Sequence, residues 1–373
     1  MEYIESQAGV AQLASRLDGT ALLAADTEAA GYHRYRDRVC LVQLSTRTET
    51  FVVDTLAVTD LRPLASVFDR AETEVVFHDA DYDLRLLDRD FGLHVGRLFD
   101  TKIAAQFLGE PAIGLGALAE KYLAITLQKK HQRADWAQRP LPAEMLEYAA
   151  EDTRHLPVLR DRLLAELQKL NRDAWAQEEF SIMQRTRWGN GAAASAGFLR
   201  TKGARDLSPR QLAALRELHA WREGSAEARD VAPFRVLSNE AVLEIARALP
   251  RTIAELSTVK GISAGLLERR GAELLAAVQA ALRLPEPELP TFPRGPRRPP
   301  PDALFEERME RLRAVRDQTA DELAVDRGFL MPRTQLEAIA RVQPKSLAQL
   351  AEVPEMRKWQ IDVLGKRLIE AMR

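Results

Sequence analysis

A proline-rich segment divides this chain and limits what can fold on either side of it. The segment runs from Leu284 to Pro301 and carries prolines at positions 285, 287, 290, 293, 296, 299, 300 and 301. Proline lacks a backbone N–H donor and has a fixed φ, so this density favours extended polyproline II over helix or central strand. We therefore predict a semi-rigid linker over residues 284–301, with separately folded units before and after it.

The residues on the two sides of this linker form an internal repeat. The offset is 94 positions (312 − 218), and it continues without a gap. Identical pairs at this offset include Leu218 and Leu312, Arg222 and Arg316, Ala226 and Ala320, Val231 and Val325, Pro250 and Pro344, Leu256 and Leu350, and Gly271 and Gly365. A repeat of this length predicts a duplicated small helical domain, at residues 206–283 and 302–373.

Residues 1–185 carry the patterns of an α/β domain with a mixed sheet. Short apolar runs predict strands at 21–25, 39–44, 51–53 and 75–77. Helical periodicity predicts helices at 60–68, 83–91, 101–108, 115–123, and 142–170 with a break near Pro157. Strands followed by alternating strands and helices are typical of an α/β fold. Loss of periodicity over 189–203 predicts the boundary with the first helical domain.

Charge and cysteine content narrow the class of protein. The net charge is −2 and the pI is near 6.4, so nucleic-acid binding would need local basic patches or metal ions that bridge acidic groups to phosphate. Cys40 is the single cysteine, which excludes an intrachain disulfide and fits a reducing compartment. We see no secretory signal and no apolar run near the roughly 18 residues of a membrane helix. We expect a cytoplasmic protein, off the membrane, with no protein partner evident.

Two acidic residues stand at the end of the first predicted strand. Asp26 and Glu28 follow the apolar run 21–25, and residues i and i+2 of a strand point to the same face. Two adjacent carboxylates repel and resist burial unless a cation or a proton compensates them. Mg²⁺ and Mn²⁺ prefer such oxygen ligands, so the pair is a candidate half of a metal site. On this motif alone, a solvated strand end explains the pattern as well.

Two further motifs carry acidic groups. Asp79, Asp81 and Asp83 follow the predicted strand 75–77, and spacing alone does not choose among them. Tyr148 and Asp152 are i and i+4 on one helix face and can share a target. A phenol beside a carboxylate can orient a water molecule, although a core tyrosine is the simpler reading of Tyr148 in isolation.

Taken together, these motifs resemble the DEDD exonuclease superfamily, and the tyrosine indicates its DEDDy branch. The resemblance implies Asp26, Glu28, Asp83 and Asp152 as metal ligands, with Tyr148 assisting the nucleophile. Asp83 is selected over its neighbours because the family motif places the aspartate before a leucine. The family chemistry implies two divalent ions, Mg²⁺ or Mn²⁺, per active site and an in-line displacement at phosphorus.

The region between the last two motifs resembles the ribonuclease D family more closely. The run Asp135-Trp136-x-x-Arg139-Pro140-Leu141 is a fairly specific signature of that family. Around it lies a basic patch with an aromatic residue inside. Its members are Lys129, Lys130, Arg133, Trp136 and Arg139. Cations hold phosphate and an aromatic plane stacks on a base, so we predict substrate contacts here. The alternative is a solvated basic loop with Trp136 packed as an anchor.

The helical repeats resemble HRDC domains. The first carries Leu218-x-x-Trp221-Arg222 and Asp230-x-x-Pro233. The second departs from the pattern at Val315, Arg327 and Glu355, so the resemblance implies its fold more firmly than any contact with nucleic acid. The whole layout resembles ribonuclease D: a ribonuclease-H-like α/β exonuclease domain followed by two small all-α HRDC-like domains.

The resemblance implies a 3′→5′ exoribonuclease that releases nucleoside 5′-monophosphates from RNA with a free 3′ end, with tRNA precursors as the expected substrate. A DNA 3′→5′ exonuclease stays open, because metal ligands do not sense the 2′-hydroxyl. A non-catalytic nucleic-acid-binding scaffold is the other alternative. The complete set of five site residues argues against it, since a scaffold has no need of them all.

Overall fold

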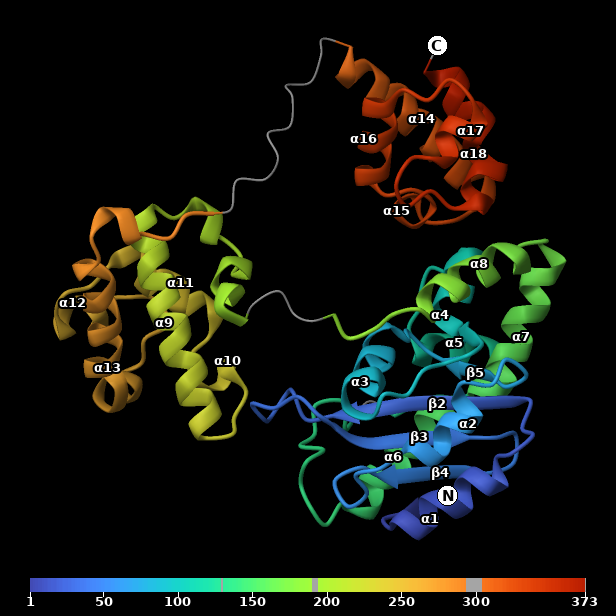
Figure 1. Cartoon of the computed structure of the whole chain (residues 1–373), viewed down its shortest axis with the longest axis horizontal. Helices are drawn as coiled ribbons and strands as arrows, with labels where there is room; N and C mark the ends of the chain where they lie inside the picture. Colours follow the sequence, from blue (N-terminus) through green and yellow to red (C-terminus); the bar gives the residue numbers. More distant parts are fainter. Residues whose placement is uncertain (129, 190–193, 293–303, 373) are drawn as a thin grey trace.

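The computed structural model describes residues 1–128, 130–189, 194–292 and 304–372. They form an N-terminal domain built on one sheet, followed by two helical modules (Figure 1). Lys129, one of the predicted substrate contacts, and residues 293–301 of the predicted linker lie outside the described residues. Within the described part of the chain, no helix is both long and apolar enough to cross a bilayer.

The N-terminal domain contains a six-stranded mixed sheet with the order β1-β4-β3-β2-β5-β6. The strands are β1 (Glu2–Ile4), β2 (Leu22–Ala29), β3 (Val39–Ser45), β4 (Thr50–Asp54), β5 (Glu74–Phe77) and β6 (Leu98–Asp100). β3 runs antiparallel to both neighbours, whereas β1–β4, β2–β5 and β5–β6 are parallel pairs. This arrangement confirms the predicted ribonuclease-H-like mixed sheet.

The helices of this domain pack against the sheet and against one another. They are α1 (Gln7–Arg16), α2 (Ala65–Phe68), α3 (Asp81–Phe91), α4 (Thr101–Leu108), α5 (Leu115–Leu123), α6 (Ala143–Arg154), α7 (Leu156–Lys169) and α8 (Asp173–Met183), with a 3-10 turn at Arg62–Leu64. α6 lies against β2, β3 and β4, and α7 continues over β2 and β5. Every residue of β3, β4 and β5 is buried, as expected of strands inside such layers.

The predicted elements agree with the structure where periodicity is long enough to read. The helices predicted at 101–108 and 115–123 have the observed bounds, and the predicted break near Pro157 falls between α6 and α7. Sequence patterns do not predict β1, β6, α1 or α8. β1 and β6 are three-residue strands, too short to show an alternation.

The two helical modules repeat one fold. The first helical module consists of α9 (Pro209–Ala228), α10 (Pro233–Val236), α11 (Asn239–Ala248), α12 (Ile253–Ser257) and α13 (Ala264–Arg283), preceded by 3-10 turns at Ala194–Arg200 and Ala204–Asp206. The second consists of α14 (Phe305–Leu323), α15 (Arg327–Leu330), α16 (Arg333–Val342), α17 (Leu347–Ala351) and α18 (Lys358–Ala371). The bounds of α15, α16 and α17 are those of α10, α11 and α12 shifted by 94, which confirms the duplication.

The duplication extends to backbone conformation. Asp230 and Ala324 occupy the same position in the repeat, and both have positive φ, at 45° and 51°. Gly261 and Glu355 form another such pair, with φ of 88° and 65°. A glutamate at a left-handed position where the other copy has glycine shows that the turn persists although the residue suited to it is lost.

The first residues of the predicted linker pack on the first helical module. A 3-10 turn forms at Glu286–Glu288, and Leu289 and Phe292 lie against the core of that module. Arg210 of α9 donates to the Leu284 carbonyl at 2.5 Å and to the Glu286 carboxylate at 2.7 Å. The segment therefore begins as an extension of the module, which the proline pattern alone does not indicate.

The second helical module shares its core with the N-terminal domain. The ring centroid of Trp359 lies 5.0 Å from that of Phe107 on α4 and 5.8 Å from that of Trp175 on α8. Its indole Nε1 donates to the Glu179 carboxylate at 2.8 Å, and Arg357 contacts the same group at 3.0 Å. The first module, in contrast, has a core cluster of its own.

We predict that Trp359→Ala will lower the free energy of unfolding by about 3–5 kcal/mol, because it empties a buried aromatic cluster. Thermal and chemical unfolding will measure the loss. Trp188→Ala is the matched control, since Trp188 is exposed and makes a surface contact with Arg89. If the unfolding midpoint of Trp359→Ala equals that of the native protein, the role assigned to this cluster is wrong.

Candidate active site

The first two acidic residues lie beyond the part of β2 that pairs with β5. β5 pairs with β2 at Leu22, Leu23 and Ala24, so from Asp26 onward β2 has a strand neighbour only on the β3 side. A register shift follows Glu28. The two carboxylates therefore project at an open sheet end, half-buried, as the i, i+2 spacing predicts.

Helix α6 brings a third carboxylate to this pair. Asp26, Glu28 and Asp152 each offer an oxygen, and these three oxygens lie within 4.8 Å of one another. Tyr148 stands one turn before Asp152 on the same helix and is largely buried. Two chain segments that are distant in sequence, β2 and α6, thus bring these side chains to one point.

Asp83 lies beside this cluster, in the first turn of α3. It is buried, and its carboxylate accepts a hydrogen bond from the Thr27 hydroxyl at 2.5 Å. Its charge acts on both Asp26 and Glu28. The competing aspartates are engaged elsewhere: Asp79 pairs with Lys102, and Asp81 pairs with Arg85.

Burial and mutual repulsion raise the pKa values of the clustered carboxyl groups. For Asp26 the main cause is burial, followed by the charges of Asp83, Asp152 and Glu28. Burial, then the charges of Asp152 and Asp83, raises the pKa of Glu28 well above its ordinary value. Burial and the neighbouring Glu151 raise the pKa of Asp152 to about 7. The site therefore gains stability from any positive charge that enters it.

Tyr148 is held as a protonated phenol next to these groups. Burial, then the negative charges of Asp152 and Glu28, raises its pKa above the ordinary value of 10.0. Its ring packs between His131 and Trp136, with centroid distances of 5.6 and 6.1 Å. The hydroxyl is therefore a fixed hydrogen-bond donor at neutral pH rather than a phenolate.

The donor set fits a hard divalent cation. Carboxylate oxygens are the ligands that Mg²⁺, Mn²⁺ and similar ions take, and Mg²⁺ keeps several waters. Gln43 is opposite Asp26 in the β2–β3 register and is fully buried. Both its amide nitrogen and its amide oxygen lack a hydrogen-bond partner among the described residues. Residues that face each other in an antiparallel pair point to the same side of the sheet, so this amide and the Asp26 carboxylate lie on one face.

Two of the predicted substrate contacts instead have structural roles. Arg139 binds the Asp54 carboxylate through Nε and Nη2, both at 2.6 Å, and donates to the Trp136 carbonyl. Trp136 is 2% exposed, with its ring packed beneath Tyr148, so no face is open for a base. We correct both predictions: Arg139 neutralises a buried aspartate, and Trp136 supports Tyr148.

The other two described basic residues remain on the surface. Lys130 is exposed and pairs with Glu144 on α6 at 2.8 Å. Arg133 is exposed, and its guanidinium lies 5.8 Å from the centre of the Tyr32 ring. Their contact with substrate stays a prediction.

A cavity of about 430 Å³ opens directly onto the cluster. Asp26, Tyr148 and Asp152 line it, together with His78 and the first turn of α5 (Gly114–Ala117). Sequence reasoning did not single out His78, Thr27 or Gln43 as parts of the site. A signal existed for each: His78 follows a strand, Thr27 separates two acids, and Gln43 is a polar residue inside an apolar run.

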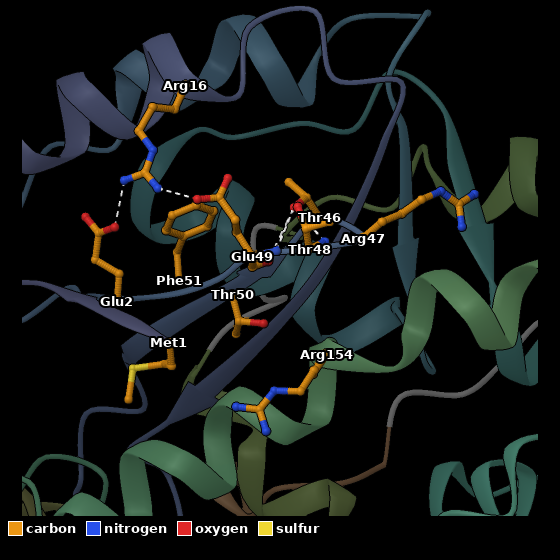
Figure 2. A pocket seen from close by; sticks show the side chains of 10 residues that line it. All are labelled: Met1, Glu2, Arg16, Thr46, Arg47, Thr48, Glu49, Thr50, Phe51 and Arg154. Atoms are coloured by element: carbon orange, nitrogen blue, oxygen red, sulfur yellow. Dashed lines mark hydrogen bonds and ion pairs between the residues drawn. The ribbon is translucent and has the colours of Figure 1, made fainter.

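A second hollow of about 380 Å³ lies at the opposite end of the sheet, near the β3–β4 turn (Figure 2). Its cations are already paired. Arg16 lies between Glu2 and Glu49, each at 2.6 Å, while Arg47 pairs with Asp161. It has no counterpart of the carboxylate cluster among the described residues, so it offers no comparable chemistry.

Comparison with known proteins places this geometry among nucleases. A 3′-5′ exonuclease family model matches residues 1–168, and an HRDC domain model matches 211–278 and 305–372. The chain is 31% identical to a ribonuclease D from Nitrobacter hamburgensis, over 98% of this chain and 94% of that one. A ribonuclease D from Pseudomonas paraeruginosa is 29% identical, covering 100% and 97%.

A solved structure extends this likeness to the whole chain. The crystal structure of Escherichia coli RNase D, described as an exoribonuclease involved in structured RNA processing, aligns with a TM-score of 0.72 at 25% identity. The alignment covers 100% of this chain and 98% of that one. The likeness therefore includes both helical modules and is not limited to the sheet domain.

We predict that divalent metal ions stabilise this protein more at pH 8 than at pH 5.5. The folded-state pKa of Asp152 is about 7, against an ordinary value of 3.8, so the metal-free fold binds a proton that the unfolded chain releases. This group's stability contribution is present at low pH and is lost between about pH 4 and pH 7. A cation takes the proton's place above that window.

Thermal unfolding with and without Mn²⁺ at the two pH values will measure the difference. In Asp152→Asn the metal-induced stabilisation will depend less on pH. Asp81→Asn is the control, because Asp81 pairs with Arg85 outside the cluster, and it will keep the native pH dependence. An equal metal-induced shift at both pH values would be inconsistent with cation binding by this cluster.

Proposed function

The chain belongs to the ribonuclease D family, and on this premise we propose that it is a metal-dependent exoribonuclease that removes nucleotides from RNA 3′ ends. The observation that carries the proposal is the convergence of Asp26, Glu28 and Asp152 within 4.8 Å, with Tyr148 beside them. Water attacks the terminal phosphodiester, the 3′ oxygen of the preceding nucleotide leaves, and a nucleoside 5′-monophosphate is released.

We propose that Asp26, Glu28, Asp83 and Asp152 hold two divalent ions, Mg²⁺ or Mn²⁺. Bound there, the ions supply Lewis-acid activation of water and stabilise the charge that develops on the leaving oxygen. Thr27 fixes the Asp83 carboxylate by its hydrogen bond. The chain's own contribution is thus a preformed ligand set, whose repulsion favours cation binding.

The other residues of the site orient the substrate. The Tyr148 phenol, protonated at neutral pH, can donate a hydrogen bond to the attacking water or to a phosphate oxygen. The cavity of about 430 Å³ is in the size range of small-ligand sites and is the place for the terminal nucleoside. Its closeness to the carboxylates supports cleavage one nucleotide from the end.

We propose tRNA precursors with extra 3′ nucleotides as the substrate. The family membership and the description of the Escherichia coli relative as an enzyme of structured RNA processing support this choice. The first helical module supports it too, because it contacts the loop beside the site through a hydrogen bond from the Ala232 N–H to the His33 carbonyl. Single-stranded ends entering the cavity would be shortened until the folded body meets the protein.

We predict that the protein shortens a 3′-extended tRNA stepwise in Mg²⁺ or Mn²⁺, and that EDTA abolishes the reaction. Asp152→Asn removes one ligand charge and will lower the rate by at least about 100-fold. Gel analysis of 5′-labelled RNA will follow the ladder of products. Release of nucleoside 5′-monophosphate will be measured in parallel.

Asp79→Asn is the matched control, because it makes the same chemical change at an exposed aspartate that pairs with Lys102. It will retain the native rate. A matched DNA strand tests the alternative substrate: equal turnover of DNA would move the assignment to a general 3′→5′ exonuclease. Intact RNA under all metal conditions, or native activity in Asp152→Asn, would refute the proposed function.

A further inference from the structure

A turn of the first helical module is hydrogen-bonded to the loop that follows β2. The backbone N–H of Ala232 donates to the His33 carbonyl at 3.1 Å, and the Asp230 carboxylate accepts from the Tyr35 N–H at 3.3 Å. Arg235 donates to the Tyr32 carbonyl at 3.0 Å. These contacts join α10 to residues 32–35, only a few positions after the metal ligand Glu28 (Figure 1).

An exposed aromatic pair lies on this junction. The rings of Tyr32 and Phe234 are 5.4 Å apart, yet Tyr32 is 41% exposed and Phe234 is 46% exposed. The Arg235 guanidinium lies 5.2 Å from the Tyr32 ring, and that of Arg133 lies 5.8 Å from it. Two open aromatic rings flanked by guanidinium groups offer bases a stacking surface and phosphates a positive field.

A cavity of about 490 Å³ is lined both by Tyr32 of this pair and by Glu28 of the acidic cluster. Its lining includes Thr27 and Glu28 at one end, and Tyr32, Arg34 and Pro233 at the other. It is distinct from the cavity that we assign to the terminal nucleoside, which lies on the Asp26 and Asp152 side. The two cavities therefore meet at the metal ligands, as they would for a strand that passes through the site.

The second module contacts the exonuclease domain without an aromatic residue at the position of Phe234. In the repeat, the Asp230 turn corresponds to Ala324, and Phe234 corresponds to Gly328. The aromatic residue of that turn, Phe329, packs against Phe107 at 4.8 Å. Phe329 is the repeat equivalent of Arg235 and is partly buried in an interface, whereas Phe234 is exposed to solvent.

We propose that Tyr32 and Phe234, with Arg133 and Arg235, form a stacking platform for the unpaired nucleotides just upstream of the RNA 3′ end. The platform is built jointly by the exonuclease domain and the first helical module, so the module contributes directly to substrate binding. This inference rests on the proposed function, because it assigns the path of the same strand. Its occupant is single-stranded RNA, with bases on the rings and phosphates toward the guanidinium groups.

A length series tests the platform. Phe234→Ala and Tyr32→Ala are compared with the native chain on single-stranded RNA from two to eight nucleotides, with kcat and KM measured for each length. We expect the ratio of kcat/KM for the octanucleotide to that for the dinucleotide to fall on the order of tenfold, mainly through KM. Phe234→Tyr, which keeps a flat ring, will restore most of the ratio.

Ile253→Ala is the matched control, because Ile253 is 45% exposed on α12, which lies on the side of the same module away from α10 (Figure 1). It will keep the native ratio. Melting temperatures show whether each variant is folded, and Tyr32→Leu, which keeps apolar bulk without a flat ring, tests the position if Tyr32→Ala is not. A native ratio in folded Phe234→Ala would overturn the platform while leaving the exonuclease assignment intact. Failure of the native chain to degrade any RNA would instead refute the proposed function itself.

Discussion

Repulsion among buried carboxylates is the constraint on which the rest of the structure depends. Asp26, Glu28 and Asp152 lie within 4.8 Å of one another, and burial opposes their ionisation. Such an arrangement costs free energy in the metal-free protein, so the surrounding fold must hold it. Two features of the fold do so. Strand β2 continues past the last residue that pairs with β5, and α6 packs against β2, β3 and β4.

The residues around the cluster divide into those that pack behind it and those that are exposed to solvent. Arg139 neutralises Asp54, and Trp136 packs against the Tyr148 ring. The run 135–141 therefore helps to hold Tyr148 in position beside the carboxylates. Tyr32, Arg133 and the α10 turn are open on the other side. The two helical modules differ in how they contact the exonuclease domain. The second packs into the domain core through Trp359, whereas the first makes hydrogen bonds to the loop that follows β2.

Sequence patterns predicted the elements that depend on residues close together in the chain or on a direct repeat of the sequence. The repeat offset of 94 and the helices at 101–108 and 115–123 agree with the structure, and three of the predicted ligands, Asp26, Glu28 and Asp152, lie together in it. The misassigned residues depend on distant partners: Arg139 reads as a substrate contact until Asp54, 85 positions earlier, is seen beside it. The junction between Tyr32 and Phe234 is likewise invisible in sequence, because no periodicity encodes how one module lies on another.

The most direct test of the account is electron paramagnetic resonance of the full-length chain titrated with Mn²⁺ at pH 8 in the presence of a nucleoside 5′-monophosphate. The account predicts that two ions bind per chain and lose the free-ion signal. Because the two ions would sit about 4 Å apart, the bound pair should show magnetic exchange. If the free-ion signal is undiminished at Mn²⁺ concentrations at which this protein degrades RNA, the carboxylate cluster is not a metal site.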